Sequence, residues 1–145
     1  MFLWDANILR AFAEIDKHPN LFLHLKEIHW SEIALPSVVV AEVLRGRCEY
    51  ALKADPIEKL PFAHRVLVET QELLNRFYVI TFDDKCAKVL KKLKQKQKRH
   101  KRYADMMIAA MALSERHVVV TRNQKDYKDL LPKNQLINWI DQKPG

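Results

Sequence analysis

Three carboxylates in this sequence stand among apolar residues, where an unpaired charge is costly. Asp5 interrupts the run FLWDANIL, Glu42 is enclosed by VVVAEVL, and Asp105 lies within YADMMIAAMA. A buried carboxylate has to be paired, bound to a metal or protonated. No Lys or Arg is embedded in the same runs, so three carboxylates that meet at one point need another cation between them. We therefore expect a divalent ion with oxygen ligands, Mg²⁺ or Mn²⁺, bound by these side chains.

Each of these residues also has a simpler interpretation. Asp5 could cap the helix that follows it, and Asp105 could cap its own helix. Glu42 is the most informative, because a glutamate in the middle of a helix between valines caps nothing. Asn7 either contacts the metal site or caps a helix N-terminus, with capping slightly favoured. Asp126 is either a fourth acidic contributor or a turn residue.

Other site chemistries find little support. Cys48 and Cys86 form no CxxC pair, and the six His include no i, i+4 pair, so we expect no zinc site. Ser37 and Ser114 have no convincing base partner for nucleophilic catalysis.

The elements that must position the carboxylates alternate between strands and helices. Apolar runs predict strands at 2–4, 33–37, 78–81, 117–121 and 135–140. Helical spacing predicts helices at 7–15, 21–28, 38–51, 62–77 and 103–115, and a further helix capped by Asp83 or Asp84. This order indicates an α/β fold, a parallel sheet with helices on both faces, in a single domain spanning 1–145. Ligands of such sheets bind beyond the carboxyl ends of the strands, and Asp5, Asn123 and Asp126 follow strands there.

The positive charge of the chain comes from one segment. The net charge is +7, yet the segment 85–102 has ten basic residues and no acidic one, and the rest has 15 basic against 18 acidic residues. A polyanion such as a nucleic-acid backbone accounts for this segment as well as a solubilising helix face does. A membrane-surface helix fits less well, because few large apolar residues interrupt the lysines. With no run of about 18 apolar residues and no basic leader, we expect a cytoplasmic protein without membrane contact.

Five short motifs follow one another along nearly the whole chain: WDANIL at 4–9, PSVVVAEVLRG at 36–46, ADMMIAAMAL at 104–113, VVVTRNQKDY at 118–127 and LINW at 136–139. In this order and spacing they resemble the PIN-domain family, in particular the VapC-type ribonuclease toxins of toxin–antitoxin pairs. The resemblance implies a three-layer α/β/α sandwich in which Asp5, Glu42 and Asp105 hold the metal. It places the family's fourth acidic position at Asn123 or Asp126. Two positions depart from the family: Ala6 replaces a small hydroxyl residue, and the segment before Asp105 is Lys-rich and lacks a glycine.

The activity implied by the resemblance is metal-dependent endoribonuclease cleavage, with Asp5, Glu42, Asp105 and Asp126 as catalytic residues. We expect Asn7, Thr121 and Asn123 to support them. The implied partners are RNA, a small cognate antitoxin that inserts a segment into the active-site groove, and a second copy of the chain in a homodimer. Basic residues would bind phosphates without reading sequence; those chosen are Lys91, Lys92, Lys94, Lys98, Arg99, Arg102 and Arg122.

The sequence leaves two alternative functions to compare with the nuclease, and they differ in the residues that they require. A haloacid-dehalogenase-type phosphatase needs a second Asp two residues after the first, and Asn7 stands there. A non-catalytic nucleic-acid-binding or regulatory module would use the basic segment alone, and only RNA binding without metal-dependent cleavage would favour it. If the carboxylates repel one another, Asp5→Asn, Glu42→Gln and Asp105→Asn should each stabilise the metal-free protein.

Overall fold

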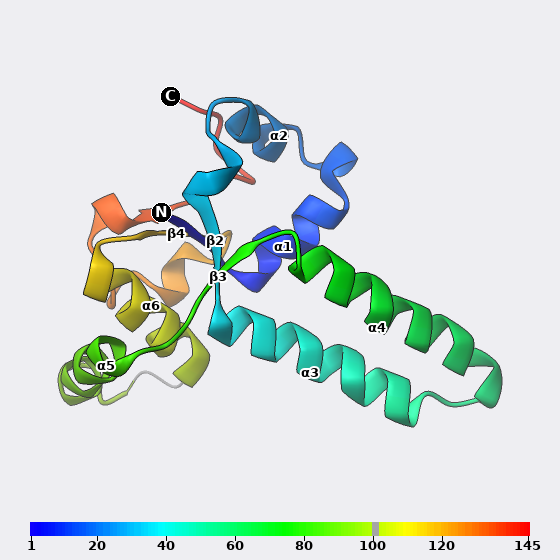
Figure 1. Ribbon diagram of the computed structural model, residues 1–145. Helices are drawn as coiled ribbons and strands as arrows, with labels where there is room; N and C mark the ends of the chain where they lie inside the picture. Colours follow the sequence, from blue (N-terminus) through cyan, green and yellow to red (C-terminus); the bar gives the residue numbers. More distant parts are fainter. Residues whose placement is uncertain (100–101) are drawn as a thin grey trace.

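The computed structural model describes residues 1–99 and 102–145 and contains a five-stranded, fully parallel sheet. The strand order is β3-β2-β1-β4-β5 (Figure 1). The strands are β1 (Phe2–Trp4), β2 (Ile33–Pro36), β3 (Tyr78–Ile80), β4 (Val118–Val120) and β5 (Leu136–Ile137). β1 is central, and its Leu3 is in register with Ala34 of β2 and Val119 of β4. The predicted parallel sheet is confirmed.

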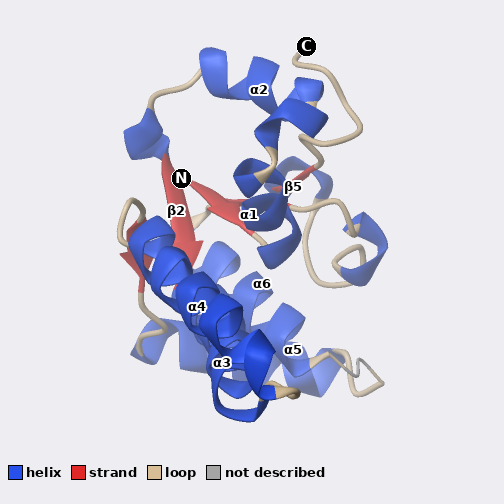
Figure 2. Cartoon of the chain, turned by 90° about the vertical axis from the view of Figure 1, so that its right-hand side faces the viewer, coloured by secondary structure: helices blue, strands red, loops and turns tan. Residues whose placement is uncertain are grey.

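The helices are α1 (Ala6–Ala13), α2 (Pro19–Lys26), α3 (Ser37–Lys53), α4 (Leu60–Leu74), α5 (Asp84–Lys96) and α6 (Tyr103–Glu115). Parallel strands are joined by crossover connections, and these are right-handed. A crossover that adds the next strand on one side of β1 therefore places its helices on one face of the sheet, and a crossover in the opposite direction places them on the other face. α5 and α6 accordingly pack together on one side of the strands, and α1 lies on the other (Figure 1). Figure 2 shows α2 at the opposite end of the molecule from α5. The predicted α/β fold with helices on both faces is therefore confirmed.

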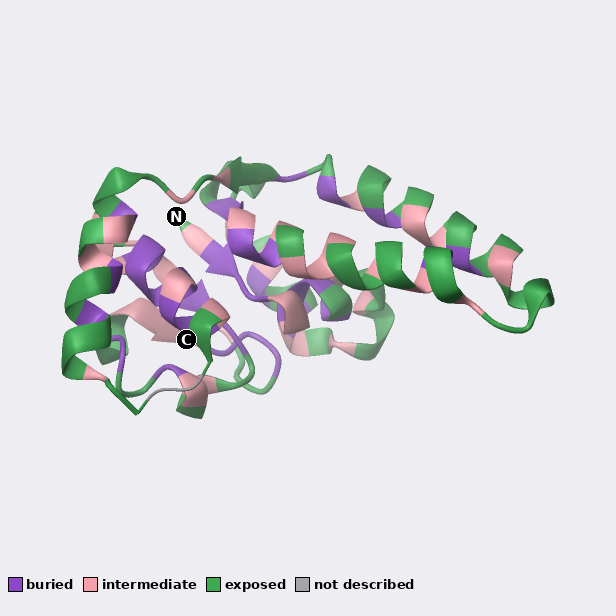
Figure 3. Ribbon diagram, turned by 90° about the horizontal axis from the view of Figure 1, so that it is seen from below, coloured by how far each residue is buried: buried purple, intermediate pink, exposed green. Residues whose placement is uncertain are grey.

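The core lies on both faces of the central strands. Leu3, Trp4, Val119 and Val120 are completely buried, as expected for parallel strands covered on both sides. α6 is buried along most of its length (Figure 3). Its alanines 109, 110 and 112 let neighbouring elements approach closely, which explains why this helix has almost no polar face.

Two boundaries are sharper than the sequence predicts. The predicted strand 135–140 is too long, because Asn138 ends β5: its side-chain oxygen accepts hydrogen bonds from the backbone N–H groups of Ile140 (2.9 Å) and Asp141 (3.1 Å). Such an Asx turn diverts the chain from the ladder. Of the two candidate caps of α5, Asp83 is the N-cap, and its carboxylate accepts from the N–H of Cys86 at 3.0 Å.

α3 and α4 form a hairpin that extends away from the sheet as an arm (Figures 1 and 3). The first part of α3 packs against the core: Val38 and Val39 are buried in it, and Val40, Val43 and Leu44 are partly buried against it. Glu42 stands on this inner part of α3 and so remains close to the sheet. Within the described ranges, no helix combines the length and apolar character needed to span a bilayer.

Candidate active site

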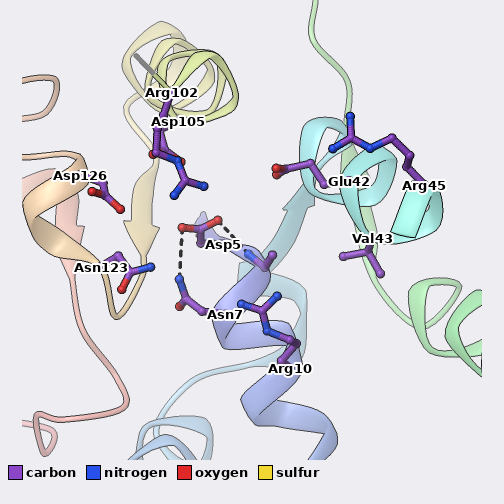
Figure 4. A pocket seen from close by; sticks show the side chains of 11 residues that line it. Asp5, Asn7, Arg10, Glu42, Val43, Arg45, Arg102, Asp105, Asn123 and Asp126 are labelled. Carbon is purple, nitrogen blue, oxygen red and sulfur yellow. Dashed lines mark hydrogen bonds and ion pairs between the residues drawn. The ribbon is translucent and has the colours of Figure 1, made fainter. Parts of the chain in front are cut away.

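The four predicted carboxylates line one pocket beyond the carboxyl ends of β1 and β4 (Figure 4). Asp5 directly follows β1, Glu42 comes from α3, Asp105 from the first turn of α6, and Asp126 from the loop after β4. Asn123 of the same loop also lines the pocket. The predicted convergence of residues separated by up to 121 positions is thus present in the fold. Both candidates for the fourth position remain open, since both reach the pocket.

Asp5 is fixed by hydrogen bonds to both carboxylate oxygens. Oδ1 accepts from the N–H of Ala6 at 2.8 Å, so Asp5 does cap α1. Oδ2 accepts from the hydroxyls of Thr121 (3.0 Å) and Tyr127 (3.2 Å) and from the amide of Asn7 (3.3 Å). Capping and pocket lining therefore occur together at this residue, and its side chain is held in one orientation.

Asn7 does not cap a helix, because the cap of α1 is Asp5. Its amide nitrogen donates to Asp5 and to the hydroxyl of Thr121 (3.1 Å), and its amide oxygen accepts from the N–H of Arg122 at 3.0 Å. The Thr121 hydroxyl also accepts from the N–H of Asn123 at 3.1 Å. Asn7 and Thr121 therefore join the end of β1 to the loop after β4; their supporting role in the site stays a prediction.

Asp105 is buried, with 4% of its surface exposed. It does not cap α6, whose N-cap is Arg102. Oδ1 accepts from the Tyr127 hydroxyl at 3.2 Å, and Oδ2 lies 3.0 Å from Nε of Arg102 in an ion pair without hydrogen-bond geometry. Among the described residues no donor satisfies this buried oxygen. Burial is the largest cause that raises the pKa of Asp105, and the charge of Asp5 raises it further. The pKa reaches about 6 although the charge of Arg102 lowers it. The apolar run around Asp105 contains no Lys or Arg, but Arg102, directly before this run, supplies a cation.

Tyr127 was missed by the sequence analysis. It is completely buried, and its hydroxyl reaches both Asp5 and Asp105. Burial and these two carboxylates raise its pKa well above the usual value, so it remains a hydrogen-bond donor. A buried tyrosine needs a partner for its hydroxyl, but the sequence places Tyr127 only as the last residue of the motif 118–127. Nothing in that motif distinguishes a core ring from a ring that contacts carboxylates.

Glu42 is half-buried, less than its valine-rich surroundings suggest. Burial, followed by the charge of Asp5, raises its pKa, whereas Arg102, Arg45 and Arg10 act in the opposite direction. Figure 4 shows the Glu42 carboxylate directed toward Asp5, with the three arginines around it. Arg10 and Arg45 were also missed, because α1 and α3 bring them to the pocket from exposed helix faces that look ordinary in sequence.

The pocket fits a hard divalent cation by the type of its donors. Carboxylate and amide oxygens are the ligands that Mg²⁺ and Mn²⁺ prefer, and the buried Oδ2 of Asp105 has no hydrogen-bond donor. As the side chains stand, no three His, Cys, Asp or Glu residues in the described part of the chain are close enough to share an ion. Binding of a cation would therefore require these side chains to draw together.

The predicted RNA-binding residues lie in three places. Lys91, Lys92 and Lys94 are exposed on α5, and Lys98 and Arg99 are exposed after its end. Arg102 lines the pocket, whereas the guanidinium of Arg122 binds the carboxylate of Asp141 through two contacts of 3.1 Å. Lys101, a further member of the basic segment, lies outside the described residues. Of these seven residues, Arg102 is the one that lines the pocket.

A parallel α/β sheet with a carboxylate pocket at its carboxyl end defines a fold and site of the PIN type. The family described as "PIN domain" matches residues 2–130, and the chain belongs to this family. It is 27% identical over 144 residues to Ribonuclease VapC2 of Rickettsia felis, covering 96% of this chain and 98% of that protein. Among solved structures, FitAcB from Neisseria gonorrhoeae superposes with a TM-score of 0.74 at 22% identity, over 98% of this chain and 100% of that one. A toxin–antitoxin complex from Klebsiella pneumoniae gives 0.67 at 20% identity, over 99% and 100%. The predicted family and fold are confirmed.

Proposed function

We propose that this protein is a metal-dependent endoribonuclease of the VapC type, acting as the toxin of a toxin–antitoxin pair. The observation that carries the proposal is the convergence of Asp5, Glu42, Asp105 and Asp126 on one pocket of a PIN-domain chain. The name of the Rickettsia felis relative, Ribonuclease VapC2, supports RNA as the substrate.

Asp5, Glu42 and Asp105 would hold Mg²⁺ or Mn²⁺, with Asp126 or Asn123 completing the site. The bound ion supplies an acidified water and offsets negative charge on the phosphodiester oxygens. The residues of this chain orient the site: Thr121, Asn7 and Tyr127 hold Asp5 by its Oδ2 atom, and Tyr127 also holds Asp105. Fixed ligands of this kind reduce the reorganisation needed during the reaction.

The basic residues would provide affinity for the RNA backbone. Lys91, Lys92, Lys94, Lys98 and Arg99 are exposed, and Arg102 lines the pocket itself. Such contacts bind phosphates and contribute little sequence choice. Arg122 would add to them only if it leaves Asp141.

The proposed partners are a small cognate antitoxin and a second copy of the chain, and the proposed location is the cytoplasm. Support for the antitoxin comes from neighbours in fold: the Klebsiella pneumoniae structure is a toxin–antitoxin complex, and a VapBC structure from Salmonella typhimurium superposes with a TM-score of 0.73.

The nuclease proposal is tested with purified protein and single-stranded RNA in Mg²⁺, in Mn²⁺ and in EDTA. We expect cleavage that EDTA abolishes and that leaves 5′-phosphate and 3′-hydroxyl ends. Glu42→Gln should reduce the rate by at least about 100-fold, whereas Glu49→Gln, an exposed residue further along α3, should not. Ends bearing 2′,3′-cyclic phosphate would reject a metal-activated water. RNA binding without cleavage, unaffected by Glu42→Gln, would instead identify a non-catalytic binding module.

The toxin proposal has its own test in cells. Expression of the chain should arrest growth, Asp105→Asn should abolish the arrest, and co-expression of the product of an adjacent short gene should relieve it. Growth that continues despite expression of an active nuclease would reject the toxin role and leave the nuclease activity standing.

A further inference from the structure

An apolar groove adjoins the carboxylate pocket and shares two residues with it. Glu42 and Arg45 line both, and beyond them the groove is lined by Val38, Phe82, Tyr103 and Met107 among others. A charged pocket therefore passes directly into a surface built from aromatic and aliphatic side chains. None of these apolar groups is needed to hold a metal ion.

Tyr103 is the aromatic residue best placed to receive a ligand. Its surface is 52% exposed although it stands at the start of α6, beside the buried Asp105. The ammonium group of Lys94 lies 4.7 Å from the centre of its ring, which gives that ring a cation on one face. Phe82, from the loop between β3 and α5, lines the same groove and is half-buried. The groove thus offers a flat, exposed ring with a positive charge next to it.

Arg45 stands at the junction of the pocket and the groove. Figure 4 shows it on the far side of Glu42 from Asp5. Within the described ranges of the chain it takes part in no ion pair. Its guanidinium can therefore bind an anion without first breaking a contact of that kind.

We propose that this groove is a nucleotide subsite, in which Tyr103 stacks on an unpaired base and Arg45 binds a phosphate next to the bond that is cut. The proposal rests on the nuclease function proposed above and adds to it the residues that bind a neighbouring nucleotide. A single-stranded nucleic acid alternates anionic phosphates with flat apolar bases, and this surface alternates in the same way: carboxylate pocket, arginine, aromatic groove. Stacking on an aromatic ring tolerates any base, because every base has a π face.

An apolar peptide fits this surface less well. The cations beside the groove, Arg45 and Lys94, favour an anionic ligand, and α5 carries further exposed lysines. A nucleotide has both a base and a phosphate, so one nucleotide can use both Tyr103 and Arg45, which line the same groove.

The test measures binding of a fluorescently labelled single-stranded oligoribonucleotide by anisotropy in EDTA, where cleavage is not expected. Tyr103→Leu should weaken binding about 10-fold or more, as loss of a base–aromatic stack does, whereas Tyr103→Phe should bind like the wild type. Tyr78→Leu is the matched control, because Tyr78 is 64% exposed on β3 and does not line the groove. Arg45→Gln should lower the slope of log K against log salt by about 0.7, and Arg47→Gln, on the same helix but outside the pocket and groove linings, should not.

A single abasic nucleotide moved along the oligonucleotide gives the decisive comparison. At one position it should weaken binding to the wild type as much as Tyr103→Leu does, and it should have no further effect on Tyr103→Leu. Equal affinities of Tyr103→Leu and Tyr78→Leu would overturn the subsite. If Tyr103→Leu changes the oligomeric state measured by light scattering but leaves RNA affinity unchanged, the subsite is also overturned, and the groove is assigned to a protein interface.

Circular dichroism and melting temperature establish that the variants are folded. The subsite and the nuclease proposal fail separately. If the wild type cleaves RNA and Tyr103→Leu binds RNA as tightly as the wild type, only the subsite is refuted. Protein that cleaves no RNA in either metal refutes the nuclease, whatever its binding.

Discussion

The hydroxyl oxygen of Tyr127 lies 3.2 Å from Oδ1 of Asp105, and both groups are buried. The same oxygen lies 3.2 Å from Oδ2 of Asp5. A hydroxyl has one hydrogen, so it donates to only one of these carboxylates at a time. Tyr127 therefore links two buried acidic groups of like charge that the chain separates by 100 positions, and in the metal-free protein it is a principal donor to Asp105.

Replacing Tyr127 with phenylalanine tests this link with little change in packing. At pH 7.5 in EDTA we expect Tyr127→Phe to lower the free energy of unfolding by about 1–3 kcal/mol, because a buried carboxylate loses its donor. The hydrogen bond from Tyr127 lowers the pKa of Asp105, so it stabilises the ionised form. The loss should consequently shrink near pH 4, where Asp105 is protonated. Urea denaturation at the two pH values measures the difference.

Tyr78→Phe serves as the control, since Tyr78 is 64% exposed and its hydroxyl should contribute little at either pH. An equal loss of stability for Tyr127→Phe at both pH values would mean that the hydroxyl does not act through the charge of Asp105.

The carboxylate set could be predicted because two independent signals coincide in the sequence. Each acidic residue interrupts an apolar run, and Asp5 follows the end of a strand, where parallel sheets gather their sites. The sequence pattern does not predict the order of the strands, and it leaves both Asn123 and Asp126 as candidates for the fourth position. The sequence also left Asn7 open between capping, which a short polar residue at the start of a helix often does, and contact with the metal site; the preceding Asp5 is the cap of α1.

The residues that escaped prediction are defined by contacts across the fold. Tyr127 resembles any aromatic core residue until β4 and its loop bring it to Asp5. Arg10 and Arg45 lie on exposed faces of helices, and their approach to Glu42 depends on how α1 and α3 cross. Arg102 belongs to a lysine-rich segment whose charge indicated either a polyanion or a solubilising helix face, yet it pairs with Asp105 at 3.0 Å.

Asp105 should make the metal-free protein less stable as pH rises. Burial raises the pKa of the folded Asp105 to about 6, above its usual 3.8, so the folded state binds more protons than the unfolded state between these values. Stability therefore falls as pH rises through this window and reaches its lower level above about pH 6. In EDTA, Asp105→Asn should remove this pH dependence. It should raise the free energy of unfolding by up to about 3 kcal/mol at pH 7 but by little at pH 4. Chemical denaturation as a function of pH measures it, with the exposed Asp129→Asn as control. A gain that is the same at pH 4 and pH 7 would contradict the assignment.

Asp5→Asn should have the opposite effect, contrary to the expectation from repulsion alone. The Oδ2 atom of Asp5 accepts from Thr121, Tyr127 and Asn7, and Oδ1 accepts from Ala6. An asparagine has one acceptor oxygen and would turn an NH₂ group toward some of these donors. We expect the free energy of unfolding in EDTA to fall by about 1–3 kcal/mol. A stabilised Asp5→Asn protein would show that repulsion from Asp105 outweighs these hydrogen bonds.

Metal binding should be visible as added stability, independently of any cleavage. A ligand that binds only the folded state at 100 times its Kd contributes about 2.7 kcal/mol, so Mg²⁺ or Mn²⁺ should raise the melting temperature of the wild type. Glu42→Gln should reduce the rise, because a carboxylate ligand is lost, whereas Glu49→Gln, exposed on the same helix, should retain it. Ca²⁺ and Zn²⁺ titrations in the same assay give the selectivity. A rise of equal size in Glu42→Gln and Glu49→Gln would place the ion elsewhere.

The lysines of α5 should control how RNA affinity depends on salt. Lys91 and Lys92 are exposed on this helix, and each phosphate contact to a single strand contributes about 0.7 to the slope of log K against log salt. Replacing both with glutamine should therefore reduce the slope by about 1.4 and weaken binding most at low salt. Lys17, which lies just before α2, and Lys26, the last residue of α2, provide a control with the same change in net charge. Figure 2 shows α2 at the opposite end of the molecule from α5. If the two double variants reduce the slope equally, the effect is one of total charge, and α5 is a solvated face rather than part of the RNA path.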